Sequence, residues 1–70
     1  MNSDAELYFK KGNSKTSLRD YKAAIKFYDK AIELRSDFQL AYKNRGFAKK
    51  LAGDIKGSEA DFKKSEELSK

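Results

Sequence analysis

The chain has 70 residues and a formal net charge of +5, and it contains no cysteine, histidine or proline. This length allows at most one small domain, spanning residues 1–70. The missing thiol and imidazole groups exclude disulfide bonds, cysteine or histidine catalysis and the usual zinc sites. The acidic residues are scattered among lysines and form no calcium-binding loop, so we expect no enzyme, no metal site and no cofactor.

The scarcity of helix-breaking residues predicts an all-α fold. Proline is absent, glycine occurs four times, and β-branched residues are rare. No apolar run is long enough for a signal peptide or a membrane span. We therefore expect a soluble, cytoplasmic protein that does not bind membranes.

The first predicted helix covers about residues 4–17. Leu7, Tyr8 and Phe9 are its apolar residues, and Gly12 lies in its interior. A glycine inside a helix costs roughly 1 kcal/mol relative to alanine, and close approach of a neighbouring helix would offset that cost. We therefore expect the next helix to fold back onto Gly12.

The second predicted helix covers about residues 20–35, with Asp20 as its N-cap. Its apolar residues recur at the three- and four-residue steps that line one side of a helix. They are Tyr21, Ala24, Ile25, Tyr28, Ala31 and Ile32. A single helix of this length is marginal in water, so it needs partners both before and after it in the chain.

Two further helices are predicted at about residues 37–52 and 54–68. The stretch Ser36-Asp37-Phe38-Gln39 resembles a capping box, which predicts Ser36 as the cap of the third helix. Gly53 and Asp54 are expected to end that helix and cap the fourth, respectively. Ala60 and Phe62 are expected on the apolar side of the fourth helix.

Identical residues recur at a spacing of 34 along the chain. The pairs are Tyr8 and Tyr42, Gly12 and Gly46, Lys15 and Lys49, Asp20 and Asp54, Lys22 and Lys56, Lys30 and Lys64, Glu33 and Glu67, and Leu34 and Leu68. This period, with two helices in each unit, predicts a helix-turn-helix repeat. Ile25 and Ile32 correspond to Glu59 and Glu66, so we expect the fourth helix to face water.

On these residues the chain resembles the tetratricopeptide repeat (TPR) family. The residues that carry the resemblance are Tyr8, Gly12, Ala24, Tyr28 and Ala31 in the first unit, and Tyr42, Gly46, Phe62 and Leu68 in the second. It implies two repeats, residues 5–38 and 39–70, stacked as a short right-handed solenoid of four antiparallel helices. Contacts between the repeats are then expected from Tyr8, Gly12, Ala24, Ile25, Tyr28, Ala31, Ile32, Tyr42, Gly46 and Phe62.

The resemblance also implies a protein-protein interaction module. In this family the first helices of successive repeats line a concave groove, which binds an extended peptide or a helix of a partner without catalysis. Here the groove candidates are Glu6, Phe9, Lys10, Asn13, Ser17, Leu40, Lys43, Asn44, Phe47, Lys50 and Leu51. The alternative for Phe9, Phe47 and Leu51 is that they are edge residues of the core.

Asn13 and Asn44 resemble the asparagines of the carboxylate-clamp subclass of this family, which holds acidic C-terminal peptides. Amide and ammonium groups donate strong hydrogen bonds to a carboxylate. The resemblance thus implies a partner with an acidic C-terminal tail. Phe9 stands where the subclass has a lysine, so the clamp is incomplete.

Two other functional classes compete with peptide binding. Two repeats leave apolar surface at both ends, so the chain could be a self-assembling structural unit that dimerises by stacking or by hairpin exchange. A basic face could instead bind nucleic acid through Lys10, Lys43, Arg45, Lys49 and Lys50. We do not expect nucleic acid as the partner, because aromatic and basic residues do not alternate as they do in known RNA-binding motifs.

Overall fold

The computed structural model describes residues 3–70, and side chains from residue 4 onward. This part of the chain forms four α-helices and no strand: α1 (Ser3–Ser17), α2 (Tyr21–Leu34), α3 (Gln39–Leu51) and α4 (Ile55–Leu68). The largest difference from the expected ranges is at α3, which begins at Gln39 rather than at 37. The prediction of an all-α fold is confirmed.

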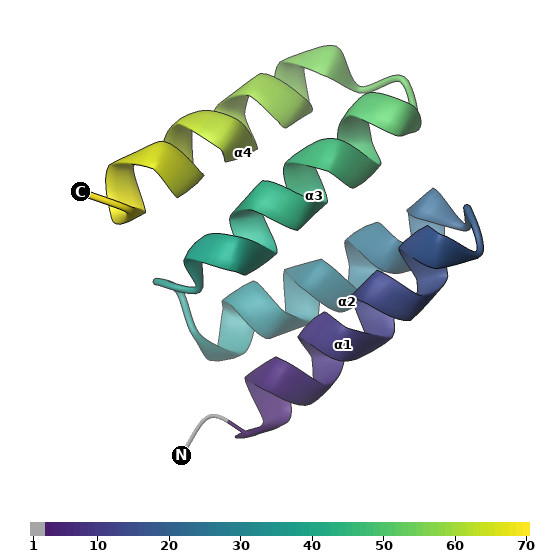
Figure 1. Cartoon of the computed structure of the whole chain (residues 1–70), viewed down its shortest axis with the longest axis horizontal. Helices are drawn as coiled ribbons and strands as arrows, with labels where there is room; N and C mark the ends of the chain where they lie inside the picture. The colour runs from purple at the N-terminus through teal and green to yellow at the C-terminus, as the bar shows by residue number, and fades with distance from the viewer. Residues whose placement is uncertain (1–2) are drawn as a thin grey trace.

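The helices form two antiparallel hairpins, α1 with α2 and α3 with α4 (Figure 1). The hairpins join where α2 packs against α3, and α1 also contacts α3. Among residues 3–70, α4 packs against α3 alone. The result is a flat layer of helices measuring 33 × 27 × 15 Å. One side of α4 and the far side of the first hairpin therefore have no helix over them.

The two hairpin turns have the same structure. The side chains of Asp20 and Asp54 cap α2 and α4 by accepting from the backbone N–H groups of Ala23 and Gly57, at 3.3 and 2.9 Å. Both cap predictions are confirmed. The residue before each cap has a positive φ, +63° at Arg19 and +96° at Gly53. This left-handed residue reverses the chain at the C-terminal end of a helix.

The predicted cap of α3 is wrong. Phe38 is the N-cap residue of α3, and no side chain makes a capping hydrogen bond there. Ser36 contributes only its backbone carbonyl, which accepts from Tyr42 Oη at 3.0 Å. Phe38 itself is buried, with its ring centroid 4.8 Å from that of Phe9 and the Arg35 guanidinium 3.9 Å above it. Burial of an aromatic ring, rather than a serine cap, thus positions the start of α3.

Small residues hold α2 close to α3. One buried cluster consists of Ala5, Ala31, Phe38 and Ala41, and the other of Ala24, Tyr28 and Ala48. Ile32 packs on the first cluster and Ile25 on the second, and both isoleucines are half-buried. Alanines at a helix crossing let the two backbones approach, while the isoleucines cover the seam.

Several residues expected between the repeats lie instead within one hairpin. A Cβ atom on Gly12 would stand 2.5 Å from Tyr28 Cε1, and one on Gly46 would stand 2.9 Å from Phe62 Cε1. Each glycine therefore admits an aromatic ring from the second helix of its own hairpin. Tyr8 likewise stacks on Phe27 of the first hairpin, with centroids 6.3 Å apart.

The buried side of α4 is polar. Its buried residues are Ser58, Asp61 and Ser65, whereas Ala60 is exposed. The expectation that Ala60 faces the core is therefore wrong. The three buried polar residues are spaced three and four positions apart, so they lie on one side of α4, and this side faces α3. Glu59 and Glu66 are exposed.

Candidate functional site

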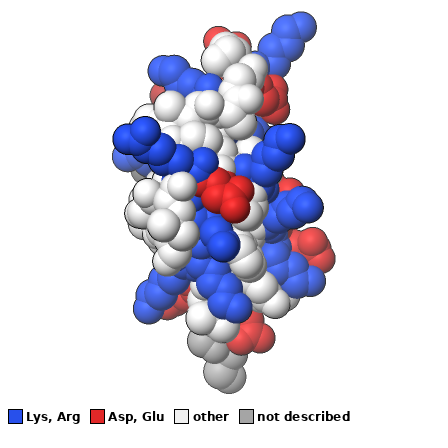
Figure 2. Space-filling model, turned by 90° about the vertical axis from the view of Figure 1, so that its right-hand side faces the viewer, with Lys and Arg blue, Asp and Glu red and all other residues white. Residues whose placement is uncertain are grey.

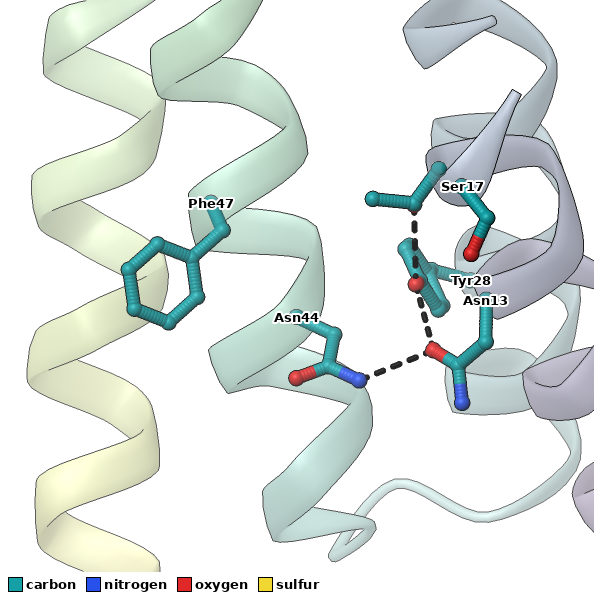
Figure 3. A pocket seen from close by; sticks show the side chains of 6 residues that line it. Asn13, Ser17, Tyr28, Asn44 and Phe47 are labelled. Atoms are coloured by element: carbon teal, nitrogen blue, oxygen red, sulfur yellow. Dashed lines mark hydrogen bonds between the residues drawn. The ribbon is translucent and has the colours of Figure 1, made fainter. Parts of the chain in front are cut away.

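A hollow of about 350 Å³ opens between the two hairpins, over the C-terminal half of α1 and the middle of α3 (Figure 3). It is lined by Asn13, Thr16, Ser17, Tyr28, Asn44 and Phe47. Tyr28 reaches it from below, because α2 passes beneath α1 and Gly12 leaves room for the tyrosine ring. Three helices thus contribute to one small polar surface.

A hydrogen-bond network forms the floor of this hollow. Tyr28 Oη donates to Asn13 Oδ1 at 2.6 Å, and Asn44 Nδ2 donates to the same oxygen at 2.9 Å. Thr16 Oγ1 lies 3.1 Å from Tyr28 Oη and 3.0 Å from the carbonyl oxygen of Gly12. The two candidate asparagines therefore bind each other, and Asn13 connects α1 to both α2 and α3.

The network fixes which groups can meet a ligand. Since Asn13 Oδ1 already accepts two hydrogen bonds, the amide nitrogen of Asn13 points away from Tyr28 (Figure 3). Burial raises the pKa of the Tyr28 hydroxyl, and hydrogen bonds from Thr16 and Asn44 act in the opposite direction. Tyr28 is therefore a neutral donor at pH 7, and the oriented asparagine amide is the donor that a ligand can reach.

A second hollow, of about 380 Å³, continues the first toward the other end of α1. It is lined by Glu6, Phe9, Lys10, Asn13, Arg35, Phe38 and Leu40. Asn13 lines both hollows, so they adjoin at this residue, and we call the two together the groove between α1 and α3. Arg35 lies 3.9 Å from Glu6 and 3.8 Å from Asp37, whereas Lys10 makes no ion pair within residues 3–70.

The remaining groove candidates lie along α3. Leu40 and Phe47 line the two hollows and are 49% and 46% exposed. Phe47 also packs edge-on against Phe62 at 4.8 Å, so it is partly a core residue as well. Lys43, Lys50 and Leu51 are exposed but line neither hollow.

An ion-pair cluster that the sequence did not suggest joins α2, α3 and α4. Asp61 is buried and accepts from Arg45 Nε and a terminal guanidinium nitrogen at 2.8 and 2.7 Å. Lys49 Nζ lies 3.3 Å from Asp61, and Arg45 also donates to Asp29 at 2.8 Å. The hydrogen bonds to Asp61 raise the pKa of Arg45 despite burial. The available signal was Asp61 itself, an acid at the place that Phe27 holds in the first repeat.

This ion-pair cluster reduces the number of basic side chains that are free to bind nucleic acid. Of the five basic candidates for nucleic-acid binding, Arg45 and Lys49 are engaged with Asp61, which leaves Lys10, Lys43 and Lys50. On the face in Figure 2, blue basic groups lie with red acidic groups between them. Within residues 3–70, no helix has both the length and the apolar character required to cross a bilayer.

Comparison with known proteins gave one family match. Residues 5–38 match the family model described as Tetratricopeptide repeat. No curated protein matched the chain. The four helices of residues 3–70, arranged as two hairpins with the same turns, fit two repeats of this kind.

Proposed function

This chain belongs to the tetratricopeptide repeat family, whose repeats are generally protein-interaction modules, and on that premise we propose that it binds a peptide or helix of a partner protein in the groove between α1 and α3. The groove supplies contacts and no catalytic chemistry. The observation that carries the proposal is the continuity of the two hollows through Asn13.

The lining of the groove suits a peptide. Leu40 and Phe47 offer apolar surface, and the Asn13 amide between them offers a hydrogen-bond donor whose direction is already fixed. A donor held in place before binding loses little entropy when a peptide carbonyl or carboxylate arrives. Sites with mostly apolar walls and a few oriented polar groups are typical of ligand recognition.

An acidic segment is the ligand that the charges favour. Lys10 lines the groove without an acidic partner among the described residues, and Lys43 and Lys50 lie on the same helix as Asn44. Hydrogen bonds from an amide and an ammonium to a carboxylate are shorter and stronger than neutral ones. A C-terminal carboxylate that accepts from Asn13 and pairs with Lys10 is therefore the finer form of the proposal.

Peptides selected from a random display library against the whole chain test the proposal. Leu40→Ser and Lys10→Glu change exposed groove residues, and Lys56→Glu changes an exposed residue of α4 as the matched control. We expect the groove variants to weaken binding about tenfold, an effect of about 1.4 kcal/mol, and the control to leave it within twofold. Equal losses in all three variants would contradict groove binding.

The finer form has its own test. The tightest selected acidic peptide is measured with a free and with an amidated C-terminus by isothermal titration calorimetry. We expect the amidated peptide to bind about tenfold more weakly, because a charge-assisted hydrogen bond contributes about 1.5–3 kcal/mol. Equal affinities of the two peptides would show that the terminal carboxylate is not recognised, and would not contradict binding in the groove.

A further inference from the structure

A third hollow lies on the first hairpin, outside the groove. It has a volume of about 460 Å³ and is lined by Tyr8, Lys15, Ala23, Lys26, Phe27 and Lys30. Tyr8 and Phe27 stack to form its aromatic floor, and Lys11 Nζ stands 5.7 and 5.9 Å from the two ring centroids. We call these seven residues the outer face. It carries four lysines and no acidic residue.

The second hairpin contains the same surface, 34 residues further on. Tyr42 and Arg45 correspond to Tyr8 and Lys11, and the cation lies over the ring in both, at 5.5 Å for Arg45 and 5.7 Å for Lys11. In the second hairpin, however, the α3 part of this surface is covered, whereas Ala60 and Lys64 of its α4 part, which correspond to Lys26 and Lys30, are exposed. Helix α2 packs against α3 there, and Asp29 of α2 accepts from Arg45 at 2.8 Å. The chain thus shows what covers the α3 part of such a surface, namely a helix that presents a carboxylate.

The charge balance of the two surfaces differs. Arg45 and Lys49 are neutralised by Asp61 from below and by Asp29 from the covering helix. On the outer face Phe27 stands at the place of Asp61, so Lys11 and Lys15 have no acid beneath them. The floor of the outer face is therefore more apolar than the corresponding surface of the second hairpin, and its rim carries more positive charge.

We propose that the outer face docks an acidic amphipathic helix of a partner protein, lying against α1 as α2 lies against α3. Its apolar side covers Tyr8 and Phe27, and a carboxylate at the place of Asp29 pairs with Lys11. Charge complementarity selects this occupant, because an approaching carboxylate enters a rim of four lysines, of which only Lys30 has an acidic partner among the described residues, Glu33 at 3.6 Å.

A second copy of the chain fits the outer face poorly. The helix that a second copy could offer in the same way is α4, whose outer side is uncovered. At the places of Ile25, Asp29 and Ile32, α4 has Glu59, Lys63 and Glu66. Lys63 would therefore meet Lys11, and glutamates would replace the two isoleucines that pack on apolar clusters. Like charges and buried glutamates both disfavour that contact.

The test uses the full chain and a stapled 14-residue helical peptide copied from α2, residues 21–34. In the peptide the lysines are replaced by glutamate, and the staple lies on the side opposite Ile25 and Ile32. The matched control peptide carries Asp29→Lys. Binding is measured by fluorescence anisotropy, and its location by amide chemical shifts of the labelled chain.

We expect the acidic peptide to shift resonances of Tyr8, Lys11 and Phe27, and the Asp29→Lys peptide to bind at least tenfold more weakly. Lys11→Glu in the chain is expected to weaken binding at least tenfold, and the exposed matched variant Lys56→Glu less than twofold. Equal affinity of the two peptides, equal effects of the two chain variants, or shifts confined to Arg45 or to the groove would each overturn the proposal.

Sedimentation of the free chain over a dilution series completes the test. We expect a monomer whose mass does not change with concentration or with Lys11→Glu. Self-association that Lys11→Glu abolishes would identify the occupant as a second copy, and would also overturn the proposal. Neither result depends on peptide binding in the groove between α1 and α3, so the two sites can fail separately.

Discussion

In the first hairpin Gly12 packs against the buried ring of Tyr28, and in the second Gly46 packs against the half-buried ring of Phe62. In both hairpins a glycine of the first helix makes room for an aromatic ring of the second helix, but the two rings differ. Tyr28 carries a hydroxyl that organises the groove through Asn13, whereas Phe62 carries none. The hydrogen-bond network on the floor of the groove therefore depends on a single added oxygen in a packing site that both repeats share.

One residue earlier in α2 and α4 the difference is reversed, because here the apolar residue is in the first hairpin and the polar residue in the second. Phe27 in the first hairpin gives an apolar floor to the outer face, and Asp61 in the second anchors Arg45 and Lys49. The comparison indicates that this position gives the first hairpin an apolar surface, while in the second hairpin it binds α4 to α3 through a buried charge. Four variants test this comparison, in order of decreasing effect.

The largest effect is expected from Ile25→Glu combined with Ile32→Glu, which gives α2 the residues of α4 at these places. Both isoleucines cover the seam between α2 and α3, so the double variant loses apolar burial and desolvates two charges. We expect a loss of about 3–5 kcal/mol, enough to unfold a domain of this size, visible as lost helical circular dichroism.

The reverse exchange is its control. Glu59→Ile combined with Glu66→Ile changes exposed residues of α4 and should leave the melting temperature the same or raise it. A folded Ile25→Glu, Ile32→Glu variant with an unchanged melting temperature would show that the repeat register is wrong.

Asp61→Asn should have the next largest effect. It removes the buried charge that binds Arg45 in a two-point contact and Lys49 at 3.3 Å. Breaking one side of a buried ion pair leaves the other charge uncompensated, at a cost of about 3 kcal/mol. Urea unfolding measures the change. The matched variant Asp29→Asn removes a half-exposed partner of the same arginine and should cost less than 1 kcal/mol, so equal losses would contradict the ranking.

Gly12→Ala should destabilise the chain more than Gly46→Ala does. The new methyl group meets the Tyr28 ring at 2.5 Å, and that ring is 1% exposed, so it has no room to shift. We expect a net loss of about 1–2 kcal/mol after the gain in helix propensity. At Gly46 the contact is 2.9 Å and Phe62 is half-buried, so its ring can move outward. Thermal melts that rank the two alanine variants the other way would contradict this comparison.

Tyr28→Phe gives the smallest effect and a pH signature. We expect a loss of about 1 kcal/mol at pH 7 from the missing hydroxyl. Because burial raises the pKa of Tyr28 above its ordinary 10.0, the folded chain retains the proton at a pH where the unfolded chain has lost it. The stability of the wild type should therefore fall relative to that of Tyr28→Phe as the pH rises above about 10. A constant difference between pH 8 and 11 would contradict the assignment.

The periodicity of the sequence was sufficient to predict the four helices and the caps at Asp20 and Asp54, because both rest on local chemistry repeated at a spacing of 34 residues. The periodicity failed where contacts between residues far apart in the sequence determine the structure. Ser36 looks like a cap, but burial of Phe38 places the start of α3.

The candidate site was predicted in outline and not in its contacts. The sequence suggested Asn13 and Asn44 as donors to a ligand, whereas in the structure Asn44 donates to the side-chain oxygen of Asn13, which also accepts from Tyr28. Asp61 was missed because an acid among charged neighbours looks exposed, and its burial depends on Arg45 from another helix.

The most direct test of the account is to locate a bound peptide by chemical shifts of the labelled chain. With a display-selected peptide, we predict the largest shifts at the side-chain amides of Asn13 and Asn44 and at the ring of Phe47, with little change along α4 beyond Phe62. Largest shifts along the exposed side of α4, with the two asparagine amides unmoved, would contradict the claim that the groove between α1 and α3 is the binding site.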